Sequence, residues 1–390
     1  MRIASVAFTN YDADPRVRRM SEALVERGDA VTAITLMQDG KPRQRSVSGV
    51  DVLGIDMPQY RGTSVRAYLA QYIRFLFAAM WLLTKLHLRN RFDVVHVNNM
   101  PDFLVFAALP AKVLGAKVIL DLHDPMPELY AAKFGGNEQH PVVRAVTVVE
   151  RTSIAFADRA ISVQQVHIDT FVSHGSKRNR FVEVQNAADT RLFPVGGAVE
   201  RPDDGLVRIV YHGTMAPRLG LDTLLLAADA LRDRHPDMRV LLIGDGDDSD
   251  RLLQIIEERS LGGIVAFEPK FIPVEDLLPH LQTCDIGVVP AGLDPFTSSM
   301  LPSKLLEYVA LGIPTACADL PAVRRYFVED ELALFPPGDV KALSYALDGL
   351  ITDKAHRLAQ AKRAMRFLDE HGWPQERQRY LDLIDELADG

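Results

Sequence analysis

Residues 298 to 314, SSMLPSKLLEYVALGIP, place two charged side chains, Lys304 and Glu307, within a short apolar stretch. Ser303 is a favourable N-cap residue and the Gly-Ile-Pro at the end is a favourable terminator, so we predict a helix of about two turns. A lysine in the first turn is mildly unfavourable unless an anion binds nearby, because it lies at the positive end of the helix dipole. Capping does not explain Glu307, since a capping box begun at Ser303 would place its acid one residue earlier. The pattern therefore indicates an anion-binding helix.

Other candidate side chains follow apolar runs that are typical of strands. His123 and Asp124 follow KVILDL, and Arg218 lies five residues after VRIVYHG. In doubly wound sheets, ligands bind at the carboxyl ends of the strands, where these side chains would gather. Each signal is weak alone, since a single histidine is commonly structural and an exposed Lys–Glu pair contributes only about a few tenths of a kcal/mol. Their shared position predicts a binding site.

Alternating strand-like and helical stretches must position these residues. In the first half, the strand-like runs are residues 2–8, 30–36, 50–55, 93–99, 117–123 and 159–163. In the second half, they are residues 207–213, 239–246, 264–269, 285–290 and 314–318. Continuous Val/Ile runs separated by helices indicate parallel sheets that are covered on both faces. We therefore predict an α/β protein with two doubly wound domains and a cleft between them.

Chain length and a Gly/Pro-rich segment suggest the domain boundaries. A chain of 390 residues is long for a single core, and PVGGAVERPDDG has the composition of a linker. We expect an N-terminal domain at 1–190, a linker at 191–205 and a C-terminal domain at 206–370. A final helix at 371–390 is expected to pack back towards the N-terminal domain.

Composition and short motifs argue against several classes of protein. The 44 basic and 52 acidic residues give a net charge of -8, which argues against a nucleic-acid-binding protein. The segment FTNYDADPR after the first strand has no glycine, so a nicotinamide-binding G-x-G-x-x-G loop is absent there. The acids of GDGDDSD, 244–250, are expected to cap a helix rather than bind a metal. Cys284 and Cys317 lie in apolar surroundings, where we expect buried free thiols and a reducing cytoplasm.

The order and spacing of seven segments resemble those of the GT-B glycosyltransferases of family 4, which are retaining enzymes that use nucleotide sugars. These segments are RVRRMSEALVERGDAVTAITL, FDVVHVNNMPDF, VILDLHDPMPELY, VQNAADTRLFP, YHGTMAPRLGLDTLLLAADAL, LLIGDGDD and PSKLLEYVALGIP. They cover nearly the whole chain. The resemblance implies two Rossmann-like domains, the first facing the acceptor and the second binding the nucleotide sugar. It also implies a hexosyltransferase or a related enzyme.

The resemblance also implies roles on the donor side. Glu307 matches the last glutamate of the E-x7-E motif and would bind the donor ribose, whereas Ser299 stands where the family has the first glutamate. Arg218 and Lys304 would bind the diphosphate and stabilise the charge that grows on it, without a metal or another cofactor. Gly213 would allow close backbone approach. The other donor-side residues implied are Phe271 and Ile272, which would line the base pocket, and Met300 and Leu301.

The resemblance places His123 opposite the transferred sugar, with Asp124 and Glu128 beside it. Arg16 and Arg19 begin the first helix, where a lipid-linked pyrophosphate could meet them. Retention in this family is usually explained by front-face attack through a short-lived oxocarbenium ion, so we expect no enzymic nucleophile.

The segment between Asp56 and Asp93 is apolar and basic and contains no acidic residue. Its longest uncharged run, Phe75 to Thr84, is ten residues, shorter than the roughly 20 needed to span a bilayer. Either this is an ordinary helix packed on the sheet, or its aromatic residues rest on anionic lipid. Its basic residues are Arg61, Arg66, Arg74, Lys85, Arg89 and Arg91. We predict a cytoplasmic enzyme, peripheral on the inner face of the cell membrane, that extends a lipid-linked glycan for a surface polysaccharide.

Two other functions stay open at this point. A non-hydrolysing sugar-nucleotide epimerase would use the same two domains and the same donor without an acceptor. A non-catalytic subunit that binds a sugar nucleotide is suggested by the absence of an acid at Ser299. Transfer releases nucleotide diphosphate only when acceptor is present, epimerisation changes the sugar, and a binding subunit does neither.

Overall fold

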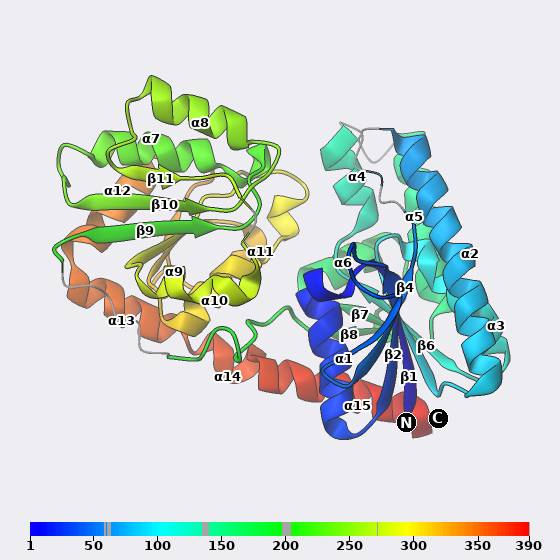
Figure 1. Ribbon diagram of the computed structural model, residues 1–390. Coiled ribbons are helices and arrows are strands. Elements are labelled where there is room, and N and C mark those ends of the chain that lie inside the picture. Colours follow the sequence, from blue (N-terminus) through cyan, green and yellow to red (C-terminus); the bar gives the residue numbers. More distant parts are fainter. Residues whose placement is uncertain (58–59, 61–63, 135–139, 197–203, 271, 390) are drawn as a thin grey trace. The chain divides into compact units, whose positions relative to one another are not determined.

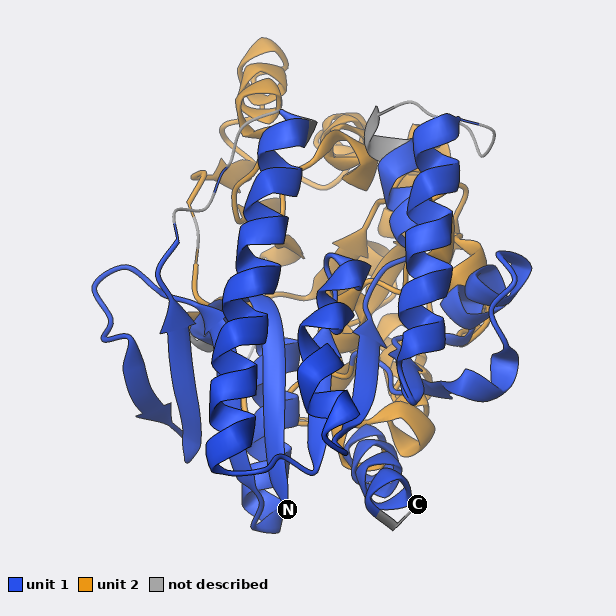
Figure 2. Cartoon of the chain, turned by 90° about the vertical axis from the view of Figure 1, so that its right-hand side faces the viewer, with its two compact units in different colours: residues 1–186, 376–390 blue, residues 187–375 orange. Residues whose placement is uncertain are grey.

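The computed structural model describes residues 1–57, 60, 64–134, 140–196, 204–270 and 272–389. The chain divides into two compact units (Figures 1 and 2). Unit 1 comprises Met1–Asn186 and Glu376–Gly390, and unit 2 comprises Ala187–Gln375. Each unit contains one sheet with helices packed on it (Figure 1), as the alternating apolar pattern predicts.

The sheet of unit 1 has the strand order β3-β4-β2-β1-β5-β6-β7-β8. All neighbouring strands are parallel except β3 and β4, which form an antiparallel hairpin at the edge. The strands are β1 (Arg2–Asn10), β2 (Ala30–Leu36), β3 (Gln44–Val47), β4 (Val50–Ile55), β5 (Val94–Asn98), β6 (Lys117–Leu122), β7 (Arg159–Ser162) and β8 (Phe181–Glu183). The central strand β5 is buried along its whole length, which explains its continuous apolar run.

The helices of unit 1 lie on both faces of this sheet. They are α1 (Pro15–Arg27), α2 (Val65–Arg89), α3 (Leu109–Val113), α4 (Met126–Phe134), α5 (Pro141–Phe156), α6 (Gln165–Ser173) and the greater part of α15 (Trp373–Asp389), with 3-10 turns η1 (Tyr11–Ala13), η2 (Asp102–Ala108) and η3 (Arg178–Arg180). From β4 through β5, β6 and β7 to β8 the chain advances in one direction across the sheet. Right-handed crossovers therefore place α2, α3, α5 and α6 on one face, and this helical layer faces the viewer in Figure 2.

The sheet of unit 2 is entirely parallel, with the order β11-β10-β9-β12-β13-β14. Its strands are β9 (Val207–His212), β10 (Met238–Ile243), β11 (Val265–Phe267), β12 (Ile286–Val289), β13 (Thr315–Ala318) and β14 (Ala333–Phe335). Its helices are α7 (Leu221–Leu231), α8 (Ser249–Glu258), α9 (Leu278–Gln282), α10 (Ser303–Leu311), α11 (Pro321–Arg324), α12 (Val340–Thr352), α13 (Lys354–Ala364) and α14 (Phe367–His371), with 3-10 turns η4 (Pro217–Leu219), η5 (Val274–Asp276) and η6 (Thr297–Ser299). Cys284 and Cys317 are buried free thiols in this core, as predicted.

The structure confirms the two doubly wound sheets, and every predicted strand overlaps an observed one. Three observed strands, β3, β8 and β14, were not predicted from the sequence. These strands have three or four residues and lie at sheet edges, so they lack a long apolar run. They gain their pairing from a longer neighbouring strand, which no local pattern reports.

The region between the predicted domains belongs partly to unit 2. Phe193 is buried in the core of unit 2, and the backbone N–H of Gly196 donates to the carbonyl oxygen of Ala310 at 3.0 Å. Residues 197–203 of the predicted linker lie outside the described residues. Unit 2 continues to Gln375, and the chain joins unit 1 at Glu376, whose buried carboxylate accepts from the backbone N–H of Gln185 at 2.8 Å.

Helix α2 combines a buried row with an exposed apolar row. Phe75, Ala79 and Leu83 are fully buried in the core of unit 1, whereas Phe77 and Trp81 are about three-fifths exposed, at 62% and 61%. Among the described residues, α2 is the one helix that is long and apolar enough to cross a membrane, although core helices pass the same test. The helix has 25 residues, because single charges interrupt the uncharged run without ending the helix. The ten-residue length of that run therefore does not decide whether α2 could cross a membrane.

Candidate active site

Helix α10 carries the two charges that the sequence singled out. It begins at Ser303, but the N-cap residue is Pro302, and no side chain caps the first turn. The expected Ser303 cap is therefore wrong, because the helix starts one residue before the predicted position. Gly312 ends the helix in the left-handed conformation, as predicted. Lys304 consequently lies in the first turn, where the uncapped backbone N–H groups add to its positive charge.

Lys304 lies over the backbone at the carboxyl end of β9. Its Nζ is 4.6 Å from the ring centroid of Tyr211, and a Cβ at Gly213 would lie 3.4 Å from its Cε. A Cβ at Gly244 would lie 2.0 Å from the carbonyl oxygen of Gly213, so the ends of β9 and β10 pack backbone against backbone. No carboxylate among the described residues pairs with the Lys304 ammonium. This site presents an unpaired cation beside closely packed main chain.

Arg218 supplies a second cation at the same edge of the sheet. It lies in η4, after β9, and its side chain is exposed with Cζ 5.3 Å from the ring centroid of Phe296. The part of the chain that the structure describes contains no ion-pair partner for Arg218. The loop is fixed by Gly220, where a Cβ would meet the carbonyl oxygen of Pro290 at 2.0 Å. Arg218 and Lys304 are thus both available to an anion.

Glu307 is held by a histidine that was not among the predicted site residues. His212, the last residue of β9, has Nε2 2.5 Å from Oε2 of Glu307 and Nδ1 2.9 Å from the hydroxyl of Tyr308. His212 is 4% exposed and Tyr308 is fully buried, so this chain of contacts is fixed by the core. The position of His212 immediately before Gly213 at the end of a strand was the signal that could have identified it.

The remaining donor-side predictions fall in different environments. Ser299 is buried in η6, where its hydroxyl donates to the carbonyl oxygen of Phe296 at 2.9 Å. Met300, Leu301 and Ile272 are partly buried and pack on the core of unit 2. Phe271 lies outside the described residues.

On the other unit, a buried ion pair lies beneath His123. Asp121, the fifth residue of β6, is fully buried, and its two oxygens accept from Nε and Nη2 of Arg16 at 2.8 and 2.9 Å. Nε2 of His96 and Nε2 of His123 each lie 3.5 Å from Oδ2 of Asp121. Burial raises the pKa of Asp121, but Arg16 and the two imidazoles outweigh this and hold that pKa well below its ordinary value. Asp121 is therefore an ionised anchor behind the His123 ring.

This ion pair corrects the role expected for Arg16. Its remaining bonds go to the carbonyl oxygen of Val184 at 3.0 Å and to Oδ1 of Asn186 at 3.0 Å. Arg16 and Arg19 are 6% and 5% exposed, so they do not form a surface that could receive a pyrophosphate. The sequence pattern could not reveal this, because Asp121 is 105 residues away along the chain.

Glu128 belongs to a second group of charges, in which Glu150 is buried and Glu128 and His174 are half-buried. Nε2 of His174 is 3.1 Å from Oε1 of Glu128, and Nδ1 is 2.8 Å from Oε1 of Glu150. The two carboxylates raise the pKa of His174 to about 10, so the imidazole is a cation at neutral pH. These three residues are the group of possible metal ligands found among the described residues, but here the imidazolium of His174 pairs with both carboxylates. Its geometry is that of an ion triad, with Glu128 turned towards His174.

The acids of GDGDDSD bind neighbouring protein groups. Asp245 accepts from the backbone N–H of Gly246 at 2.8 Å and from the hydroxyl of Ser249 at 2.7 Å. Asp248 is the N-cap residue of α8, but its side chain pairs with Arg251 instead of capping the helix. The expected capping by these acids is thus replaced by a turn and an ion pair.

A cavity of about 330 Å³ opens beside His123 in unit 1, a volume at the lower end for small-molecule sites. Four aromatic side chains form much of its wall: Phe8, Tyr60, Tyr68 and Tyr72. Phe8 meets Tyr72 edge to face at a centroid distance of 4.9 Å. Asp14 and Asp124 also line the cavity, whereas none of its described lining residues is lysine or arginine. Aromatic faces with carboxylates suit an uncharged polyhydroxylated ring and disfavour a phosphate.

Comparison with known proteins identifies both units. Residues 13–187 match the family described as "Glycosyl transferase 4-like domain", and residues 198–367 match "Glycosyl transferases group 1". The chain is 24% identical over 220 residues to a putative colanic acid biosynthesis glycosyl transferase, WcaI, of Escherichia coli, covering 52% of this chain and 51% of that protein. It is 23% identical over 284 residues to glycogen synthase of Mycobacterium tuberculosis, covering 72% and 66%. The matches thus span about half to two thirds of these relatives.

Solved structures resemble the chain over almost its full length. Sucrose-phosphate synthase from Thermosynechococcus elongatus has a TM-score of 0.79 at 18% identity, covering 99% of both chains. The catalytic domain of starch synthase IV from Arabidopsis thaliana, bound to ADP and acarbose, has a TM-score of 0.74 at 14% identity, covering 100% of both chains. HepE from Anabaena, in complex with UDP-glucose, has a TM-score of 0.73 at 14% identity, covering 98% of this chain and 99% of that one. These likenesses establish the fold.

Proposed function

Because this chain belongs to the GT-B glycosyltransferases, we propose that it is a retaining enzyme that transfers a sugar from a nucleoside diphosphate sugar to a glycan or a lipid-linked glycan. The observation that carries the proposal is the arrangement at α10, where Lys304 lies over Gly213 and Glu307 is held by His212. A cation over closely packed main chain suits a diphosphate, and a fixed carboxylate suits a ribose diol.

The two unpaired cations of unit 2 would serve the chemical step. Negative charge develops on the diphosphate as the bond to the sugar breaks, and fixed cations stabilise charge that grows in the transition state. Lys304 adds the N–H groups of the first turn of α10, and Arg218 adds a planar guanidinium that can bind two phosphate oxygens. We therefore expect transfer to proceed without a divalent metal, since these residues supply the positive charge.

His123 would face the sugar that is transferred. Its backbone N–H donates to Oδ1 of Asn99 at 2.9 Å, and its ring is backed by the ionised Asp121. A carboxylate behind an imidazole fixes the ring and favours a proton on the nitrogen that faces it. We propose that His123 contacts the sugar in the transition state and that Asp121 acts as its positioning residue. Attack by the acceptor on the same face of an oxocarbenium ion would require no enzymic nucleophile.

The acceptor would enter the cavity beside His123. Because the charged side chains of its described lining include carboxylates and no lysine or arginine, the reacting unit of the acceptor is proposed to be an uncharged sugar. This proposal replaces the expectation from the sequence that a pyrophosphate of the acceptor binds at Arg16 and Arg19. A lipid-linked glycan is still compatible, because its phosphate can lie outside the cavity while its terminal sugar reaches His123.

We also propose that the protein is peripheral on the inner face of the cell membrane. The exposed row of α2 follows helical spacing, at Leu69, Ile73, Phe77 and Trp81, and Lys85 Nζ lies 5.0 Å from the ring centroid of Trp81. Exposed aromatic residues beside basic ones suit the interface of an anionic bilayer. Arg61 of the predicted basic set lies outside the described residues.

One incubation separates this function from its alternatives. Purified protein is mixed with UDP-, GDP- and ADP-sugars, with and without short glycans, and the nucleotide and sugar products are separated by chromatography. Release of nucleoside diphosphate that depends on the acceptor, with the sugar appearing on the glycan, would support transfer. A changed sugar on intact nucleotide would indicate an epimerase. Binding without either product would indicate the non-catalytic subunit that the buried Ser299 suggests.

Membrane binding is tested separately, by co-sedimentation with phosphatidylcholine vesicles that contain or lack phosphatidylglycerol. We expect binding to the anionic vesicles that weakens with salt and with the double change Phe77→Ser and Trp81→Ser. Tyr345→Ser, which changes an aromatic residue of unit 2 that is 82% exposed, is the matched control. Equal binding by the α2 variant and the control would remove α2 from the membrane contact.

A further inference from the structure

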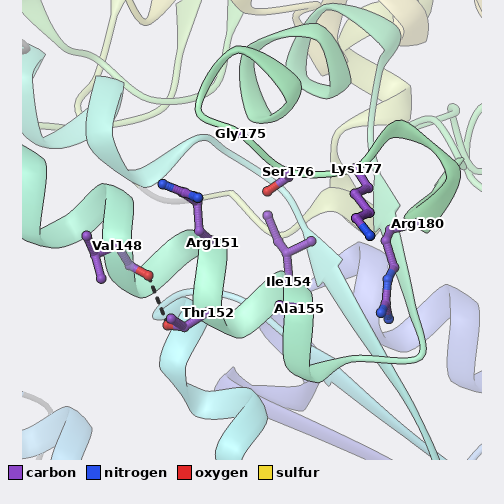
Figure 3. A pocket seen from close by; sticks show the side chains of 9 residues that line it. All are labelled: Val148, Arg151, Thr152, Ile154, Ala155, Gly175, Ser176, Lys177 and Arg180. Atoms are coloured by element: carbon purple, nitrogen blue, oxygen red, sulfur yellow. Dashed lines mark hydrogen bonds between the residues drawn. The ribbon is translucent and has the colours of Figure 1, made fainter.

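Unit 1 contains a second cavity, of about 500 Å³, that the proposed transfer reaction does not use. It lies between α5 and the segment that joins α6 to β8 (Figure 3). Arg180 immediately precedes β8, and its Nη1 donates to the carbonyl oxygen of Ala157, just before β7, at 2.6 Å. This part of the cavity is therefore at the amino ends of these strands. His123 follows the carboxyl end of the parallel strand β6, at the opposite edge of the sheet.

The cavity is basic. Arg151 lies on one side, Lys177 and Arg180 lie on the other, and Ser176 lies between them (Figure 3). None of the nine described residues that line the cavity is acidic. Arg151 and Lys177 have no ion-pair partner anywhere in the described part of the chain. In a protein with a net charge of -8, this unpaired positive charge is a local feature.

Two further observations, at Gly175 and Ser176, indicate that the binding site is already formed without a ligand. A Cβ at Gly175 would lie 3.2 Å from Cζ of Arg151, and φ at Gly175 is +99°, so the glycine lets the guanidinium lie against the loop. The hydroxyl oxygen of Ser176 is buried and has no hydrogen-bond partner. By contrast, the hydroxyl of Thr152, on the α5 wall of the cavity, donates to the carbonyl oxygen of Val148 at 2.9 Å (Figure 3). A buried donor without a partner, beside three cations, is typical of a site for an oxyanion.

We propose that this cavity binds the phosphate group of an anionic membrane lipid. The same positive charge could hold a free phosphate, but the position of the cavity favours the lipid. Helices α2, α3 and α5 lie on one face of the sheet, where α2 packs on η2 and α3, and α5 packs on η2. The exposed apolar side chains of this face include Phe77 and Trp81 on α2, Val113 on α3 and Val148 beside the cavity itself. A bilayer that receives these side chains would bring its phosphates to the level of Arg151 and Lys177.

This inference rests on the proposed membrane association but not on the transfer reaction. It adds a defined headgroup site to what would otherwise be a diffuse attraction between basic residues and an anionic surface. A site near the bilayer would also fix the rotation of unit 1 on the membrane. Arg151 is on α5 and Lys177 is on the segment after α6, so they would give a second point of contact apart from the exposed row of α2.

The test compares two double variants that change charge equally. The first carries Arg151→Glu and Lys177→Glu in the cavity. The second carries Arg144→Glu, on α5 outside the cavity lining, and Lys41→Glu, on the turn after β2, and both of these residues are exposed. Binding to vesicles with and without phosphatidylglycerol is measured by co-sedimentation at two salt concentrations. Inorganic phosphate and glycerol phosphate are titrated by calorimetry. Thermal stabilisation by nucleoside diphosphates confirms that each variant is folded and retains unit 2 function.

Because each basic side chain near the headgroups contributes about fivefold to partitioning, and the introduced glutamates are in addition repelled by the anionic surface, we expect the cavity variant to bind phosphatidylglycerol vesicles at least about 30-fold more weakly. The control should lose fivefold or less. Equal losses in the two variants would overturn the cavity as a site. Binding of inorganic phosphate that the cavity variant abolishes, with vesicle binding unchanged, would overturn the lipid as its source. Absence of wild-type binding to anionic vesicles would overturn the membrane association itself, while acceptor-dependent transfer would still be decided by its own assay.

Discussion

The contact between Glu307 and His212 gives the sharpest test of the donor site. We expect Glu307→Ala to weaken donor binding because its carboxylate would accept hydrogen bonds from the ribose. Nε2 of His212 already contacts Oε2 of Glu307 at 2.5 Å, so Oε1 is the oxygen that remains for the nucleotide. A hydrogen bond to a charged group contributes about 1.5 to 3 kcal/mol, which corresponds to a roughly 10- to 150-fold rise in the donor dissociation constant. Turnover should fall less, since the ribose contact is present in the ground state and the transition state alike.

The assay is calorimetric titration of nucleoside diphosphates, because it needs no acceptor and no knowledge of the sugar. UDP, GDP and ADP are first compared on the wild-type protein, and the tightest of them is then compared with its 2′,3′-dideoxy form. The wild-type protein should lose affinity for the dideoxy nucleotide by about the same factor as Glu307→Ala loses for the natural one. Glu307→Ala itself should bind the two nucleotides almost equally, because the lost hydroxyls no longer have a partner.

Two further variants show whether the orientation of Glu307 matters. His212→Gln removes the ring that holds the carboxylate and should raise the dissociation constant by less than tenfold, without a change in the preference for ribose. Glu329→Ala is the matched control, because Glu329 is an exposed glutamate of unit 2 that pairs with Arg324 on the surface. An unchanged dissociation constant in Glu307→Ala, or the same dideoxy penalty in Glu307→Ala as in the wild-type protein, would refute the ribose assignment.

The other predictions concern turnover, stability and metal. Arg218→Ala and Lys304→Ala should each lower turnover by roughly 100-fold, the size of effect seen when one hydrogen-bond donor to an oxyanion is removed. Near wild-type initial rates in both variants would refute the proposed binding of the diphosphate by these two cations. His123→Ala should abolish transfer while calorimetry still finds nucleotide binding, provided that its melting temperature matches the wild-type value; retained transfer would exclude the proposed role. The pKa of His174 is raised from 6.5 to about 10, so the stability that it adds is complete below pH 6.5 and is lost as pH rises towards 10. The melting temperature of His174→Gln should therefore decline less over this range, and parallel curves would contradict the ion triad. Treatment with EDTA should leave the initial rate of transfer unchanged within about twofold, and a large loss that Mg²⁺ restores would show that the two cations do not suffice.

The sequence by itself determined the order of the elements and the positions of several candidate residues. Buried parallel strands need apolar side chains on both faces, so they are visible as continuous Val/Ile runs between helices. Strands end where polar residues begin, and for this reason the order of residues alone places Lys304, Arg218 and His123 after the carboxyl ends of strands. The end of α10 was equally predictable, because Gly312 adopts a left-handed backbone conformation, which residues other than glycine rarely adopt.

The tertiary structure alone decided which of these charges are free and which are already paired. Arg16 and Arg218 are both arginines near the ends of strands, yet Arg16 is buried against Asp121 and Arg218 is exposed without an ion-pair partner among the described residues. Pairing brings together residues that are 105 positions apart, as Arg16 and Asp121 are, or 95 positions apart, as His212 and Glu307 are. Local patterns carry no information on such distant partners, because helix and strand periodicities arise between neighbours in the chain. The desolvation of a charge, and hence its role as an anchor or as a binding group, depends on the packing of the whole unit.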